Sequence, residues 1–139
     1  MIETVRRQRA AQAVVDRFLH TVLAFGERDC IRLGAMALRE MGRPAGLTRA
    51  GSYSTLLGAT RAMKRAGFAD LVEAVDAQGL ERIAPAAALA ADLVMLPAEA
   101  PFGGALTMAV GNGRVIGWHD SVDTAEILQP VAYIAAWRL

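Results

Sequence analysis

The chain contains a single cysteine, Cys30, which directly follows an aspartate, Asp29. Asp29 is a candidate helix N-cap, because its carboxylate can accept hydrogen bonds from the first free backbone N–H groups. A thiol in the first turn of that helix would feel the positive end of the helix dipole, which lowers its pKa. Cysteine peptidases pair such a thiolate with a histidine base. The alternative role for Cys30 is that of a small apolar residue on the buried side of the helix.

The first half of the chain is predicted to be helical, because its apolar residues recur at helical spacing. Helices are expected at about residues 5–23, 29–41, 55–66 and 69–77. Val22 is expected on the buried face of the first helix and Leu56 on that of the third. Ser54 or Thr55 caps the third helix, and glycines follow the ends of the helices.

The second half of the chain predicts strands at about residues 93–96, 105–110, 114–118 and 131–139. Asn112 between two glycines is a strong hairpin signal, because it tolerates the positive φ of a tight turn. Tyr133 and Trp137 are expected to lie inside the last strand. Helices followed by a small antiparallel sheet indicate an α+β fold, and we expect a single domain over residues 1–139.

Composition narrows the classes of function. The chain has 139 residues, of which 54% are hydrophobic and 21% charged, and a net charge of +1. This charge gives no indication of a nucleic-acid partner. One cysteine cannot form an internal disulfide, and two histidines with one cysteine make a zinc site improbable, so we expect no metal and no cofactor. The longest apolar stretch, residues 83–98, is interrupted by Pro85, Asp92 and Pro97, so we expect no membrane insertion.

Several short segments, taken in order, resemble a known family. Residues 25–30 (F-G-E-R-D-C) resemble the W-G-x-x-D-C opening of NlpC-type cysteine peptidases. They are closer still to a small phage-borne family of unassigned function with the same layout. Residues 49–55 (R-A-G-S-Y-S-T) and 58–62 (G-A-T-R-A) are similar to its arginine-glycine-tyrosine loop and following helix. Residues 91–94 (A-D-L-V) and 136–139 (A-W-R-L) are similar to its G-D-v-v and closing A-W-R-v segments.

This resemblance covers about residues 18–139 and implies a papain-like, NlpC-type fold encoded among the tail-tip genes of siphophages or related prophages. In active relatives, a histidine opens the second strand and a third polar residue follows the glycine-rich turn. The corresponding positions here fall near Ala105 and near Gly117, and neither can act as a base. His119 lies just past the second position and remains the only candidate base, provided that the register or a loop differs. Asp29 and Asp92 can be placed in one of two ways. Either they face each other near Cys30, or Asp29 caps a helix and Asp92 belongs to a separate turn before a strand.

Without a base, Cys30 would be a vestigial nucleophile, because general base catalysis alone is worth about 10²–10⁴-fold in rate. The resemblance, together with the missing base, therefore implies a pseudo-peptidase that is a structural or assembly protein of the tail tip, located in the virion and made in the host bacterial cytoplasm. Its partners would be hub or central-fibre proteins. Phe102, Ile127 and Leu128 lie in two apolar loops and are the predicted docking residues.

Two alternatives remain open at this point. The first is an active cysteine hydrolase of peptidoglycan peptides that uses Cys30. The second is a cellular α+β binding domain with no viral connection.

Overall fold

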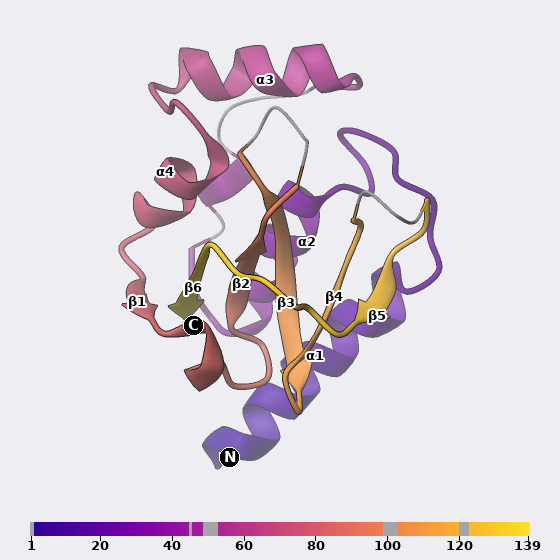
Figure 1. The fold of residues 1–139 in the computed structure, drawn as a ribbon, viewed down its shortest axis with the longest axis vertical. Coiled ribbons are helices and arrows are strands. Elements are labelled where there is room, and N and C mark those ends of the chain that lie inside the picture. Colours follow the sequence, from indigo (N-terminus) through magenta and orange to yellow (C-terminus); the bar gives the residue numbers. More distant parts are fainter. Residues whose placement is uncertain (1, 45, 49–52, 99–102, 120–122) are drawn as a thin grey trace.

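The computed structural model describes residues 2–44, 46–48, 53–98, 103–119 and 123–139. Within these ranges the chain forms an α+β fold in which four α-helices pack with one six-stranded antiparallel sheet (Figure 1). The helices are α1 (Glu3–Phe18), α2 (Cys30–Glu40), α3 (Leu56–Arg65) and α4 (Leu71–Asp76), with short 3₁₀ turns η1 (Gly46–Thr48) and η2 (Pro85–Ala87). The strands are β1 (Glu81–Ile83), β2 (Leu93–Leu96), β3 (Ala105–Gly111), β4 (Arg114–Gly117), β5 (Glu126–Leu128) and β6 (Ala135–Arg138).

The last strand lies inside the sheet rather than at its edge. The strand order is β1-β6-β2-β3-β4-β5, and every neighbouring pair is antiparallel. The chain therefore has to cross the sheet between β5 and β6. Figure 1 shows this crossing segment, residues 129–134, passing over β4 and β3 on the side away from α1 and α2.

Side chains alternate between the two faces of the sheet and form two buried clusters. The larger cluster joins the helices to one face, and its strand members include Met95, Leu106, Met108, Ile116 and Trp137. The smaller cluster lies on the opposite face and contains Val94, Leu96, Ala109, Val115 and Ala136.

Helix α2 lies directly against strand β3. A Cβ atom added to Gly34 would lie 2.7 Å from the Leu106 Cδ2 atom, so a larger residue at position 34 would require the Leu106 side chain to shift. This contact fixes the first turn of α2, and with it Cys30, relative to the sheet.

The caps and turns expected from the sequence are confirmed. The Asp29 side chain accepts a hydrogen bond from the Arg32 N–H at the start of α2, and the Thr55 hydroxyl accepts one from the Gly58 N–H at the start of α3. Asn112 has a φ of 56° between β3 and β4, as the hairpin signal predicted.

Other expectations were wrong. Helix α1 ends at Phe18, because the backbone turns at His20, whose φ is 66°, and Val22 is 58% exposed rather than buried. The last strand is limited to Ala135–Arg138, and Tyr133 in the preceding segment is 41% exposed. Leu56 is 38% exposed at the first position of α3. Strands β1 and β5 were not predicted, since each has three residues and no clear alternation.

Among the residues that the structure describes, none of the helices has both the length and the apolar character needed to cross a bilayer.

Candidate functional site

Cys30 is the first residue of α2, and Asp29 stands immediately before it as the N-cap. The Asp29 side chain is buried, with one oxygen 2.8 Å from the Arg32 nitrogen and the other 2.7 Å from the Gly26 nitrogen. The carboxylate therefore holds the turn of residues 26–29 onto the start of the helix. The arrangement places a negative charge beside the thiol.

The turn before α2 meets the loop before α3. Gly26 has a φ of 87°, and a Cβ atom at this position would overlap the Tyr53 carbonyl oxygen. The Tyr53 hydroxyl is buried without a hydrogen-bond partner. Its burial is the main cause that raises the pKa of Tyr53, and the negative charge of the neighbouring Asp29 carboxylate is the second. The Arg32 guanidinium lies 5.5 Å from the centre of the Tyr53 ring. Two segments that carry the family resemblance are thus in contact.

The thiol of Cys30 is not activated. Cys30 as a residue is partly buried, and it packs against the main core. Burial, and then the negative charge of Asp29, raise the pKa of the Cys30 thiol to about 12. Hydrogen bonds with backbone groups of Leu106 and of the first helical turn lower the pKa, but by less than burial and Asp29 raise it. Of the two roles that the sequence left open for Cys30, this agrees with the small apolar one, because desolvation and the capping carboxylate outweigh the helix dipole.

Both histidines have their partners elsewhere. The His119 ring lies 3.0 Å from the Pro97 carbonyl oxygen, in a pocket lined on its other side by Leu128 and Pro130. The His20 ring is exposed and lies 3.0 Å from the Glu126 carboxylate. The structure thus brings Asp29 and Cys30 together but does not bring His119 to them.

The resemblance expects a base near Ala105 and its orienting residue near Gly117, and packing leaves little space at Gly104, which adjoins Ala105, and at Gly117. A Cβ atom at Gly104 would lie 2.8 Å from the Leu96 carbonyl oxygen and 3.0 Å from the Met95 sulfur. At Gly117, a Cβ atom would lie 2.6 Å from the Thr107 Cγ2 atom. The Thr107 hydroxyl is itself buried and donates to the Val94 carbonyl oxygen at 2.8 Å. A larger polar side chain at Gly104 or Gly117 would require its neighbours to move.

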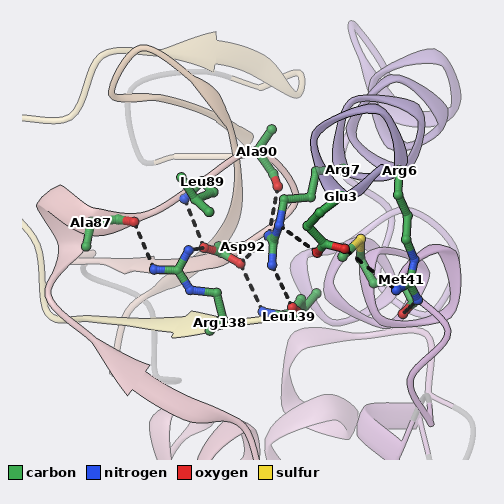
Figure 2. Close-up of polar contacts among 10 residues, drawn as sticks. All are labelled: Glu3, Arg6, Arg7, Met41, Ala87, Leu89, Ala90, Asp92, Arg138 and Leu139. Carbon is green, nitrogen blue, oxygen red and sulfur yellow. Dashed lines mark hydrogen bonds and ion pairs between the residues drawn. The ribbon is translucent and has the colours of Figure 1, made fainter. Parts of the chain in front are cut away.

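Asp92 belongs to a second polar cluster, separate from Asp29 (Figure 2). Its fully buried carboxylate lies 2.7 Å from the Arg7 guanidinium and 3.2 Å from that of Arg138. It also accepts hydrogen bonds from the Leu89 and Leu139 N–H groups, both at 2.9 Å. This cluster joins α1, the turn before β2 and the end of β6, so the role of Asp92 is structural.

Trp137 in β6 makes a similar structural contact. Its indole N–H donates to the Asp76 carboxylate at 2.8 Å, and the Arg82 guanidinium lies 5.2 Å from the centre of its ring system. Hydrogen bonding to Arg82, and then to Trp137, lowers the pKa of Asp76. The closing A-W-R-L segment therefore ties β6 to α4 and, through Arg138, to the Asp92 cluster.

The predicted docking residues differ in how exposed they are, and one of them is not described by the structure. Ile127 is 38% exposed on β5 and Leu128 is partly buried beside it, whereas Phe102 lies outside the described residues. The sequence analysis missed the exposed apolar side chains of Val131, Tyr133 and Ile134 in the crossing segment, because it assigned residues 131–139 to a strand. Over the described ranges, no group of three or more His, Cys, Asp or Glu side chains could hold a metal ion.

Comparison with known proteins gives a family but no activity. No curated protein matches the chain. A family model described as "Domain of unknown function (DUF6950)" matches residues 4–139, nearly the whole sequence. The chain therefore belongs to the DUF6950 family.

Proposed function

We propose that the protein is a structural component of a bacteriophage tail tip, or of a prophage-derived one, and that it docks there on hub or central-fibre proteins. Its layout is that of a papain-like, NlpC-type domain whose cysteine no longer serves as a nucleophile. The assignment to this layout is supported by a cysteine at the start of a helix that packs against an antiparallel sheet. The contact of Gly26 with Tyr53 adds support, because it joins two of the segments that carry the resemblance.

One observation carries the docking proposal, namely the uncharged and exposed crossing segment. Val131 is 99% exposed, Ile134 43% and Tyr133 41%. Residues 127–137 contain no charged side chain. Exposed apolar residues so close together in an uncharged segment are typical of a protein–protein contact.

A hollow of about 360 Å³ adjoins this surface. It is lined by Leu96, Pro97 and His119 from the sheet side and by Leu128 and residues 129–132 from the crossing segment. A partner side chain can insert here, as anchoring residues do at the centre of stable interfaces. His119 would then contact the partner rather than act as a base.

The Cys30 environment argues against the alternative of a cysteine hydrolase. A nucleophilic thiol needs a lowered pKa or an adjacent base, and Cys30 has a raised pKa and no histidine among its contacts in the described structure. The thiol is therefore protonated at neutral pH.

The proposal is tested by composition analysis of particles from a phage or induced prophage that encodes this chain. Quantitative mass spectrometry of purified tails should find the chain at a fixed ratio to the tail-tip proteins. Val131→Asp with Ile134→Asp should reduce its incorporation at least tenfold. The matched control is Leu56→Asp with Leu57→Asp, which places the same two charges on apolar side chains that are 38% and 58% exposed on α3. Absence of the wild-type chain from purified particles would rule out the proposal.

The hydrolase alternative is tested with Cys30→Ser in the same phage. We expect unchanged infectivity and no cleavage of peptidoglycan stem peptides by the purified wild-type protein. Cleavage that depends on Cys30 would establish the alternative instead.

A further inference from the structure

A second hollow lies between helices α2, α3 and α4 and the turn η1, well separated in sequence from the crossing segment. Its volume is about 310 Å³. Three of its lining residues follow one another at helical spacing, namely Ala59 and Ala62 on α3 and Ala66 at its C-terminal cap. Ala74 and Ala77 line it from the region of α4. The small side chains of these alanines leave space between the two helices unfilled.

The lining of this hollow defines the chemistry of what can occupy it. Larger apolar side chains complete its wall, among them Ile31, Met63 and Phe68. None of the described lining residues carries a carboxylate, ammonium or guanidinium group. Burying a charge here would be costly, since no opposite charge is available to pair with it.

Two polar side chains also line the hollow. They are Tyr53, whose hydroxyl is buried, and Gln78, whose amide donates to the Ala74 carbonyl oxygen at 2.9 Å. An apolar wall with one or two neutral polar groups is the usual composition of a small-molecule site. The volume is also at the lower end of the range of about 300–1,000 Å³ for such sites.

The geometry points to a binding site for a neutral, mainly apolar small molecule about the size of a two-ring aromatic compound. A dry cavity of about 150 Å³ in another protein holds one benzene ring, so roughly twice that volume accommodates two fused rings. The inference goes beyond the proposed function, because none of the residues used for docking line this hollow.

Indole is a suitable probe, and the methionine methyl groups are suitable reporters. Met63 lines the hollow, whereas Met108 is fully buried in β3 and does not line it. In protein labelled with ¹³C at the methionine methyls, titration with indole should shift the Met63 signal saturably and leave the Met108 signal in place.

Ala62→Phe should fill the hollow and weaken indole binding at least tenfold. Ala13→Phe, on α1, is the matched control and should bind indole as the wild type does.

Circular dichroism establishes that each variant is folded. If Ala62→Phe does not fold, Ala66→Met, at an exposed position on the rim, provides the filling variant. The inference is overturned if the Met63 shift does not saturate, if Met108 shifts equally, or if a folded filling variant binds indole like the wild type. Incorporation into particles is measured separately, so failure of this site leaves the proposed docking function untouched.

Discussion

Gly26 lies so close to Tyr53 that a Cβ atom at position 26 would overlap the Tyr53 carbonyl oxygen. This contact joins the turn that precedes α2 to the loop that precedes α3, two segments separated by the whole of α2 in sequence. The position of Cys30 thus depends on a glycine four residues before it, and on the carboxylate of Asp29, which accepts a hydrogen bond from the Gly26 N–H.

Gly26→Ala should therefore destabilise the fold by more than the cost of its backbone conformation. A left-handed conformation costs a non-glycine residue about 1–2 kcal/mol, and the overlap with Tyr53 adds to this. Gly67→Ala is the matched control, because its φ is 91° and nothing lies within 4 Å of an added Cβ atom. We expect Gly26→Ala to lose at least about 1 kcal/mol more than Gly67→Ala in urea unfolding. Equal losses would contradict the close contact.

Asp92→Asn should be strongly destabilising, because it leaves the buried guanidinium of Arg7 with the exposed Glu3 carboxylate as its remaining negative partner. Removing one member of a buried ion pair costs about 3–5 kcal/mol. Asp16→Asn, which alters an exposed carboxylate on α1, should change stability by less than about 0.5 kcal/mol. Chemical denaturation measures both, and a loss for Asp92→Asn as small as that of the control would show that the cluster carries little stability.

Cys30 should react slowly with iodoacetamide. Because its thiol pKa is raised to about 12, the thiolate fraction at pH 8 is about 10³-fold below that of an ordinary thiol. We expect the rate to rise about tenfold per pH unit through pH 10, and to increase sharply when the protein is unfolded in urea. A rate that reaches a plateau below pH 8 in the folded protein would mean an activated thiolate.

The same pKa shift predicts a loss of stability at alkaline pH. Above pH 9 the Cys30 thiol ionises in the unfolded chain but stays protonated in the folded chain, whose pKa is about 12. The unfolded state binds fewer protons in this window, so stability falls as the pH rises, by up to about 1.4 kcal/mol per unit. Cys30→Ala should show a shallower decline between pH 9 and 10.5. Parallel pH profiles for the two proteins would contradict the shift.

Trp137→Phe should cost about 1–3 kcal/mol, because it removes the indole hydrogen bond to Asp76 and part of a fully buried ring system. Tyr133→Phe is a suitable control, since Tyr133 is 41% exposed in the crossing segment. Thermal unfolding should show a clearly lower midpoint for Trp137→Phe and almost no change for Tyr133→Phe. If the two midpoints fell by the same amount, the contact with Asp76 would be of no consequence.

The features that the sequence predicted well are those with local causes. Asp29 and Thr55 cap helices because their side chains bond to backbone groups three residues away, and Asn112 marks its hairpin through its own φ. Such signals lie within a few residues of the structure that they determine.

The features that it missed depend on distant parts of the chain. Strand β1 exists because β6 returns to pair with it, through contacts such as Arg82 with Trp137. The exposure of Tyr133 follows from the crossing between β5 and β6, which a pattern of apolar residues cannot reveal. The raised pKa of Cys30 likewise reflects its burial against β3, whereas the sequence left open whether the helix dipole or burial would decide the pKa.

The position of β6 between β1 and β2 has a consequence for synthesis on the ribosome. The centre of the sheet is incomplete until residues 135–138 have emerged, and Arg7 and Asp92 must wait for the Leu139 backbone before their contacts are complete. Pairings between residues so far apart in sequence form slowly and late. A nascent chain that has reached β5 still exposes the edges of β1 and β2, so we expect it to need protection by chaperones until translation has passed β6.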